Sequence, residues 1–194
     1  MTQKNPLIKN IKDHIKILKK DQKQIFNKGN LLKKMIVDCF NAKGKLLVFG
    51  NGGSAADAQH LSTELTVRLK KNRAALPAIS LVTDTSALTA IGNDFKFKYI
   101  FRRQLEALAN KNDLILPIST SGNSQNIIEA LKYSKKKKYK IFGILGNKGG
   151  AIKNLCTNSF IVSSNNPSRV QEIHIIFWQS VCEIIENIYA NKQK

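Results

Sequence analysis

The sequence has few cysteines and no long apolar run. Cys39, Cys156 and Cys182 are far apart and form no C-x-x-C pair, which argues against a disulfide framework and indicates small buried side chains in a reducing compartment. No apolar run approaches the length of a membrane span, and residues 1–20 mix charges with isoleucines instead of forming a signal-peptide core. These absences predict a soluble cytoplasmic protein with no membrane partner.

Acidic residues are also scarce. There are 13 Asp and Glu against 32 Lys and Arg, which gives a formal net charge of +19. A charge of this size suggests a nucleic-acid partner. The basic residues are spread along the whole chain, however, and no aromatic residues interleave with them as a stacking platform requires. We therefore expect no nucleic-acid partner and a positive field that attracts anionic substrates.

The 194 residues, 42% of them hydrophobic, fit one globular domain with a substantial core. Apolar residues at helical spacing predict a long helix over residues 7–42, with a break near 20–23. Short apolar runs predict strands at 45–49, 78–82, 114–118, 141–145 and 160–162. Helical stretches are expected at 54–70, 85–93, 97–110, 124–138, 151–155 and 168–190. This alternation predicts an α/β fold, a doubly wound five-stranded parallel sheet flanked by helices.

The same pattern divides the chain into two segments. Residues 1–42 form a helical N-terminal arm that packs on the domain or on another subunit, and residues 43–194 form the α/β domain. In a parallel sheet, ligands bind beyond the carboxyl ends of the strands. Residues 50–54 (GNGGS) and 119–124 (STSGNS) each follow a predicted strand and open a predicted helix. We therefore expect both loops at one edge of the sheet.

The composition of these two loops suits a phosphate group. Glycine lets backbone N–H groups approach an anion closely, serine and threonine hydroxyls add donors, and a helix N-terminus adds unpaired N–H groups. One such loop could be only a tight turn, whereas two in matching contexts point to a shared ligand. The loops predict a site for a phosphorylated polyol.

A dinucleotide site is the main alternative for the first loop. Gly50, Gly52 and Ala55 match the pattern G-x-G-x-x-A after a strand. That pattern also requires an acidic residue about 20 residues further on, and Asp84 lies much later in the chain. The second loop would have no role in such a site, so the sugar-phosphate interpretation ranks above it.

Several polar residues have both a functional and an ordinary interpretation. His60 and Glu64 lie four positions apart and therefore share one helix face. They could be a metal-binding or acid–base pair, or only a hydrogen-bonded pair on the surface. Gln171 and His174 lie near the start of the last predicted helix. Residues 93–94 (ND) follow an apolar helix and fit its C-cap.

A resemblance to a known family rests on five motifs taken together and in order. They are GNGGSAADAQH (50–60), TDTSAL (83–88), IGNDF (91–95), ISTSGNS (118–124) and RVQEIH (169–174). This series closely resembles the phosphoheptose isomerases, which are sugar isomerase (SIS) domain proteins, and the resemblance spans nearly the whole chain. It implies a five-stranded parallel sheet between helices, assembled as a homotetramer with active sites at the subunit interfaces.

The resemblance also implies roles for particular residues. Glu64 would be the catalytic base, and one Zn²⁺ per subunit would be held by His60, Glu64, Gln171 and the residue at position 179. The substrate contacts implied are Asn51, Gly52, Gly53, Ser54, Glu64, Asn93, Asp94, Ser119, Thr120, Ser121, Ser124 and Gln171. Within this set, the second loop would hold the phosphate.

The chain departs from the family at one of these positions. The family has a histidine there, as metal ligand and acid–base partner, and this chain has Gln179. Glutamine can coordinate through oxygen but cannot carry a proton near neutral pH. Gln171 and Gln179 are about 12 Å apart along a helix axis, which favours a site built across an interface.

The implied activity is that of an aldose–ketose isomerase. It would convert D-sedoheptulose 7-phosphate to D-glycero-D-manno-heptose 7-phosphate through an enediol, the first step of bacterial nucleotide-activated heptose synthesis. The heptose would go to lipopolysaccharide, capsule or another glycan. Two alternatives stay open: an isomerase of another phosphosugar, and a non-catalytic SIS protein that binds the bacterial replication initiator. Gln179 and the basic charge favour the non-catalytic protein, whereas the retained pair of His60 and Glu64 argues against it.

Overall fold

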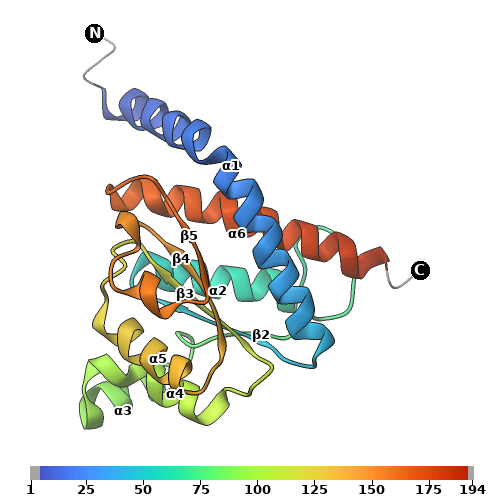
Figure 1. Ribbon diagram of the computed structural model, residues 1–194, viewed down its shortest axis with the longest axis vertical. Helices are drawn as coiled ribbons and strands as arrows, with labels where there is room; N and C mark the ends of the chain where they lie inside the picture. Colours follow the sequence, from blue (N-terminus) through green and yellow to red (C-terminus); the bar gives the residue numbers. More distant parts are fainter. Residues whose placement is uncertain (1–4, 192–194) are drawn as a thin grey trace.

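The computed structural model describes residues 5–191, so residues 1–4 of the predicted arm and 192–194 of the predicted domain lie outside it. A five-stranded sheet with the order β2-β1-β3-β4-β5 forms its centre (Figure 1). The strands are β1 (Leu46–Gly50), β2 (Ala78–Ser80), β3 (Leu114–Ser119), β4 (Lys140–Leu145) and β5 (Asn158–Ile161). Every ladder is parallel, which confirms the predicted sheet.

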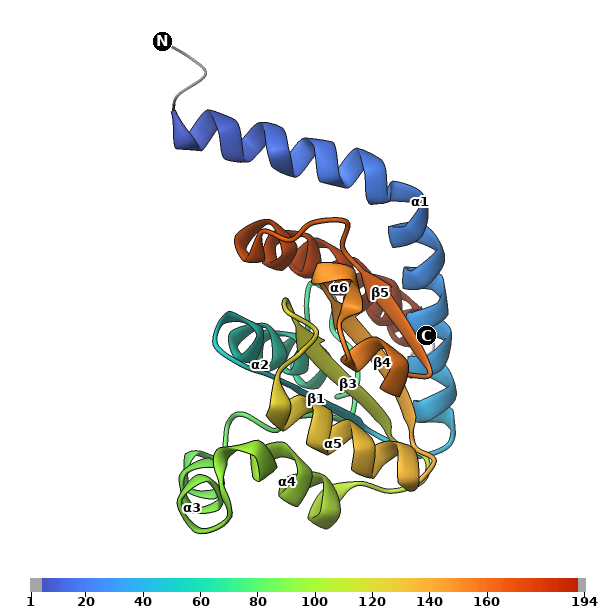
Figure 2. The same ribbon diagram turned by 60° about the vertical axis from the view of Figure 1, so that its left-hand side comes forward.

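Helices cover both faces of the sheet, as Figures 1 and 2 show. On one face lie α1 (Pro6–Asn41), α2 (Gly53–Thr66) and α6 (Pro167–Ala190). On the other lie α4 (Ile100–Leu108) and α5 (Gln125–Lys136), with α3 (Thr85–Phe95) beyond them; 3₁₀ turns occupy Phe97–Tyr99, Asn147–Gly149 and Ile152–Leu155. Because both faces are covered, every residue of β1 and β3 is buried.

Helix α1 continues through residues 20–23 without the predicted break, although Figure 2 shows it bending part-way along its length. Leu32, Ile36 and Phe40 in its second half are buried in the same core as the sheet. Leu7 and Ile11 in its first half are 72% and 59% exposed. The first half of α1 therefore leaves an apolar stripe uncovered within one chain.

Several helix ends differ by one to four residues from the sequence prediction, and two of them bear on the site. Helix α2 ends at Thr66 rather than at residue 70, because the carboxylate of Glu186 on α6 accepts the backbone N–H groups of residues 69–71 at 2.7–3.0 Å and draws that segment off the helix axis. Helix α3 extends to Phe95, so residues 93–94 lie inside its last turn. The alternative interpretation of these residues as a C-cap that follows the helix is therefore wrong.

The strand order locates the point where the chain reverses direction across the sheet. The chain passes from β1 outward to β2 and then returns to β3 on the other side of β1. Gly50 at the end of β1 is in register with Ile118 near the end of β3. Both Gly/Ser loops therefore begin at the switch point, where doubly wound sheets bind their ligands.

Within residues 5–191, no helix combines the length and the apolar character that a bilayer crossing requires.

Candidate active site

The two Gly/Ser loops are joined by a reciprocal pair of hydrogen bonds. Asn51 in the first loop donates from Nδ2 to Oδ1 of Asn126 at 2.9 Å, and Asn126 donates from Nδ2 to Oδ1 of Asn51 at 2.8 Å. Asn126 is only 3% exposed and lies in the first turn of α5, directly after the second loop. The structure thus brings both loops together across the switch point.

The second loop is a rigid turn with donors left over. The Ser119 hydroxyl oxygen accepts the Gly122 N–H at 3.1 Å, and Gly122 has φ +67° in a place where a Cβ would collide with the Gly149 carbonyl. Ser124 is the N-cap of α5, yet its side chain makes no capping bond. The Ser124 hydroxyl and the free N–H groups at the start of α5 suit an anion.

The first loop opens helix α2, which carries the acid–base pair. Gly52, with φ +54°, is the N-cap of this helix. Two turns further on, His60 Nε2 lies 2.8 Å from Glu64 Oε1. The His60 side chain is 51% exposed and the Glu64 side chain 13% exposed. A largely enclosed carboxylate beside a half-exposed imidazole can act in proton transfer to a bound molecule.

Helix α6 runs parallel to α2 and adds further groups to this region. A Cβ on Gly53 would collide with the Gln171 amide, so Gln171 lies against the first loop. Further along, the rings of Trp178 and His60 meet edge to face, with centroids 5.0 Å apart. Gln179 follows Trp178 and is half-buried. The α2 and α6 elements thus place His60, Glu64 and Gln171 in one region.

Asn93 and Asp94 do not join these residues within one chain. Both are exposed near the end of α3, where Asn93 Nδ2 donates to Asp94 Oδ1 at 2.9 Å. Figures 1 and 2 show α3 beyond α4 and α5, across the sheet from α2 and α6. A role for Asn93 and Asp94 in the site of His60 and Glu64 therefore requires a second copy of the chain.

Two further titratable groups lie near the predicted site. Burial raises the pKa of the Asp57 carboxyl to about 6, with a partial offset from His60. His174 is fully buried on α6, and this burial lowers the pKa of its imidazole to about 4. His174 is therefore a neutral core side chain near pH 7 and does not replace a histidine at position 179.

The donor set for a zinc ion is incomplete in this chain. His60 and Glu64 offer an imidazole nitrogen and a carboxylate oxygen 2.8 Å apart, and both are usual zinc ligands. No group of three His, Cys, Asp or Glu side chains suited to a metal occurs in residues 5–191. Gln171 and Gln179 offer only amide oxygens. The residues present fit a weakly held ion better than a permanent one.

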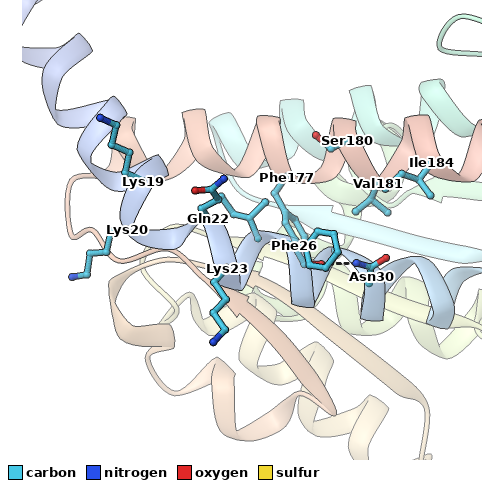
Figure 3. Close-up of a pocket in the computed structure, with 12 residues that line it drawn as sticks. Lys19, Lys20, Gln22, Lys23, Phe26, Asn30, Phe177, Ser180, Val181 and Ile184 are labelled. Atoms are coloured by element: carbon cyan, nitrogen blue, oxygen red, sulfur yellow. Dashed lines mark hydrogen bonds between the residues drawn. The ribbon is translucent and has the colours of Figure 1, made fainter.

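A groove of about 620 Å³ lies away from this chemistry, between α1 and α6. Phe26 from α1 lines it together with Phe177 and Val181 from α6, and Figure 3 shows the lysine side chains pointing away from these residues. Phe26 is 70% exposed. An apolar groove of this kind suits another protein surface rather than a sugar phosphate.

Sequence reasoning missed two residues of the site. Asn126 gave no signal, because its partner Asn51 lies 75 positions earlier and only the fold joins them. Trp178 is the single tryptophan of the chain and precedes Gln179, the residue that differs from the family. Its contact with His60 could not be predicted, because it depends on how α6 lies against α2.

Comparison with known proteins places the chain among sugar isomerases. Residues 8–146 match the SIS domain family. The phosphoheptose isomerase of Aliarcobacter butzleri is 51% identical over 154 residues, 79% of this chain and 82% of that protein. A phosphoheptose isomerase of Campylobacter jejuni is 47% identical over 161 residues, 82% of this chain and 87% of that protein.

Two solved structures extend the similarity to the fold. The phosphoheptose isomerase from Francisella tularensis superposes with a TM-score of 0.88 at 32% identity, covering 96% of this chain and all of that one. The phosphoheptose isomerase from Neisseria gonorrhoeae gives a TM-score of 0.87 at 35% identity, covering 93% of this chain and 97% of that one. Since identity and fold agree over most of both chains, the chain belongs to the SIS domain family and, within it, to the phosphoheptose isomerases.

Proposed function

We propose that this chain is an aldose–ketose isomerase that converts D-sedoheptulose 7-phosphate to D-glycero-D-manno-heptose 7-phosphate. The observation that carries the proposal is the pair of loops joined by Asn51 and Asn126 at the switch point, in a chain 51% identical to a phosphoheptose isomerase. The loops supply donors for a phosphate, and α2, which starts in the first loop, supplies the His60–Glu64 pair.

The reaction moves a proton from C1 to C2 of the open-chain sugar. Glu64 takes one C1 proton, the electron pair of that C–H bond forms the C1=C2 double bond, and O2 of the former carbonyl gains a proton to give the enediol. Return of the proton from Glu64 to C2, with loss of the O1 proton, gives the C1 aldehyde of the aldose. The hydrogen bond from His60 to Glu64 orients the carboxylate for this work. Since Gln179 cannot carry a proton, we assign exchange of the hydroxyl proton to half-exposed His60.

Binding of the phosphate is assigned to the second loop. Thr120, Ser121 and Ser124 offer hydroxyl groups, and the first turn of α5 offers free N–H groups. Buried Ser119 braces the turn through its bond to Gly122. Asn51, Gly52, Gly53, Ser54 and Gln171 lie on the neighbouring loop or against it and are assigned to the sugar hydroxyls.

A zinc ion is proposed as a weakly held partner of His60 and Glu64, with the amide oxygens of Gln171 and Gln179 as the remaining donors from this chain. When bound, a divalent cation would stabilise negative charge that develops on a substrate oxygen. An imidazole and a carboxylate that both bind one cation are less available as bases, so Glu64 serves best as a base when that ion is loosely bound.

We also propose a homotetramer whose active sites lie between subunits. The exposed apolar side chains of the α1 arm, the groove beside Phe26, and α3, which buries none of its own residues, all support further contacts between copies. A neighbouring copy would bring Asn93 and Asp94 to the site. The proposed setting is the cytoplasm, with the product supplied to lipopolysaccharide, capsule or another heptose-containing glycan.

The alternative of a non-catalytic SIS protein that binds the bacterial replication initiator keeps one observation in its favour, Gln179 at the family's histidine position. An isomerase acting on another phosphosugar would use the same loops. Turnover of sedoheptulose 7-phosphate distinguishes both alternatives from the main proposal. The non-catalytic protein would turn over no sugar, and the other isomerase would turn over only a different phosphosugar.

The deciding experiment is a coupled assay with sedoheptulose 7-phosphate on the wild-type protein, Glu64→Gln and Glu183→Gln. Glu183 is a matched control, since it lies on α6 and forms an exposed ion pair with Lys70. We expect turnover by the wild type and by Glu183→Gln, and a loss of about 100-fold or more in kcat for Glu64→Gln. No turnover by the wild type, or full turnover by Glu64→Gln, would contradict the proposal.

A further inference from the structure

Trp178 is the largest fully buried side chain of the protein's described part, with no exposed surface at all. It lies on α6 and faces α2. Its ring meets the His60 ring at an interplanar angle of 76°, an edge-to-face arrangement with centroids 5.0 Å apart. Such aromatic pairs stabilise by about 0.5–1.5 kcal/mol beyond the burial of their area, enough to favour one ring orientation over others.

The contact belongs to a regular match between the two helices. Gln171 lies against Gly53, Trp178 against His60, and Cys182 one turn later faces Glu64. Burial raises the pKa of the Cys182 thiol to about 12, and the charge of Glu64 adds to the rise. Helix α6 thus lies beside α2 at three points along its length, and Trp178 is the residue that touches the imidazole.

His60 needs such support because much of its ring faces solvent. Its side chain is 51% exposed, and it is hydrogen-bonded through Nε2 to Glu64. A ring held only at Nε2 can rotate about χ2 and about the Cα–Cβ bond. A rigid indole against the ring restricts these rotations and keeps Nε2 directed at the carboxylate.

We propose that Trp178 is a positioning residue that fixes the orientation of the His60 imidazole and, through it, of the Glu64 carboxylate. The inference rests on the proposed function only for its catalytic consequence, since the contact itself is independent of the reaction. Loss of a group that orients an active-site side chain typically lowers activity or metal affinity 10- to 100-fold. The effect falls on kcat rather than on KM, because Trp178 is fully buried and the phosphate is held by another loop.

The test compares Trp178→Phe, Trp178→Leu and Phe177→Leu in the full chain. Phe177 is the matched control, because it is the adjacent α6 residue and equally buried, but it stacks on Phe160 at 4.1 Å instead of meeting His60. We expect kcat to fall at least 10-fold in Trp178→Leu and less than 3-fold in Trp178→Phe, which keeps an aromatic ring. Phe177→Leu should lose thermal stability while keeping kcat within 3-fold.

A second measurement reads the orientation of His60 without turnover or metal. The chain has three histidines, so the His60 ring signals in a ¹H–¹³C NMR spectrum can be assigned with His60→Asn. In the wild type, the ring current of the nearby indole should displace the chemical shifts of the His60 ring protons from those of a histidine in an unfolded peptide. Trp178→Phe should retain part of this displacement. If Trp178→Leu does not fold, this shift in the wild type and in Trp178→Phe decides the question.

The outcomes separate this inference from the proposed activity. A wild type without isomerase activity contradicts the proposed function, while the NMR shift still tests the orientation of His60. Unperturbed His60 shifts in the wild type would overturn the positioning role. Equal losses of kcat in Trp178→Leu and Phe177→Leu, or a loss in Trp178→Phe as large as in Trp178→Leu, would overturn it as well.

Discussion

Asn51 and Asn126 exchange two amide hydrogen bonds of 2.9 and 2.8 Å although 75 positions separate them in the chain. One residue belongs to the loop after β1 and the other to the first turn of α5. Because β1 and β3 flank the point where the chain reverses across the sheet, this pair joins the two loops at the place where a ligand enters. The distance between the proposed phosphate-binding loop and the proposed sugar-binding loop therefore depends on these amides.

The first prediction concerns this pair. Asn126→Ala removes both bonds and leaves the Asn51 amide without its partner, so we expect a loss of about 1–3 kcal/mol in unfolding free energy and a several-fold rise in KM for the phosphosugar. Urea denaturation and steady-state kinetics measure the two effects. The double variant Asn51→Ala/Asn126→Ala should lose less than the sum of the two single losses. Strictly additive losses would show that the pair is not coupled.

The second prediction concerns Ser124 and phosphate binding. Its hydroxyl makes no capping bond to α5, so Ser124→Ala should leave the melting temperature nearly unchanged. A hydrogen bond to a charged phosphate contributes about 1.5–3 kcal/mol, so KM should rise about 10-fold or more. Ser180→Ala is the control, since Ser180 is exposed on α6 and bonds only the Ile176 carbonyl in its own helix. An unchanged KM in Ser124→Ala would exclude Ser124 from the phosphate site.

The third prediction concerns Gln179 and zinc. A histidine there adds an imidazole to His60 and Glu64, which completes the minimum set of three usual protein ligands. We expect Gln179→His to bind Zn²⁺ at least 10-fold more tightly in calorimetric titration. Its activity should also become more sensitive to chelators than that of the wild type.

Gln22→His serves as the control for that substitution, because Gln22 is exposed on α1 and lines the apolar groove, of which neither His60 nor Glu64 is part. Equal zinc affinity in the wild type, Gln179→His and Gln22→His would show that position 179 does not face the cation. Higher kcat in Gln179→His would indicate that glutamine limits the natural enzyme.

The sequence predicted the strands well and the helix ends less well. The central strands β1 and β3 are short apolar runs buried on both faces, so their positions follow from composition. The edge strands β2 and β5 are only partly buried, and their ends lie one or two residues from the predicted ones. The end of α2 at Thr66 does not follow from composition, because it depends on Glu186, which lies more than a hundred positions later and binds the backbone at residues 69–71. Local helical periodicity carries no information on such a distant carboxylate.

The same distinction applies to the site. Both loops and the His60–Glu64 pair follow from residue type and spacing within a short segment. The contacts of Asn51 with Asn126 and of His60 with Trp178 depend on how separate elements pack, so a single sequence gives no sign of them. The side chains to which we assign binding and catalysis could be proposed from the sequence, whereas the contacts of Asn126 and Trp178 with them could not.

The last prediction concerns His174 and the pH dependence of stability. Burial lowers the pKa of its imidazole from 6.5 to about 4. Between these values the unfolded chain binds more protons than the folded chain, so the contribution is complete above pH 6.5 and is lost as the pH falls toward 4. At about 1.4 kcal/mol per pH unit, the folded state should lose about 2 kcal/mol from this residue at pH 5 relative to pH 7.

Asp57 acts in the opposite direction, since burial raises the pKa of its carboxyl from 3.8 to about 6 and favours the folded state as the pH falls below 6. The two effects partly cancel in the wild type, so the informative quantity is a difference between proteins. Urea denaturation of the wild type and His174→Gln at pH 7 and pH 5, at one protein concentration, isolates the histidine. The wild type should lose about 2 kcal/mol more than His174→Gln over this range, because glutamine does not titrate and Asp57 is common to both. An equal loss in the two proteins would contradict the prediction. It would mean that the pKa of His174 is the same in the folded and the unfolded state.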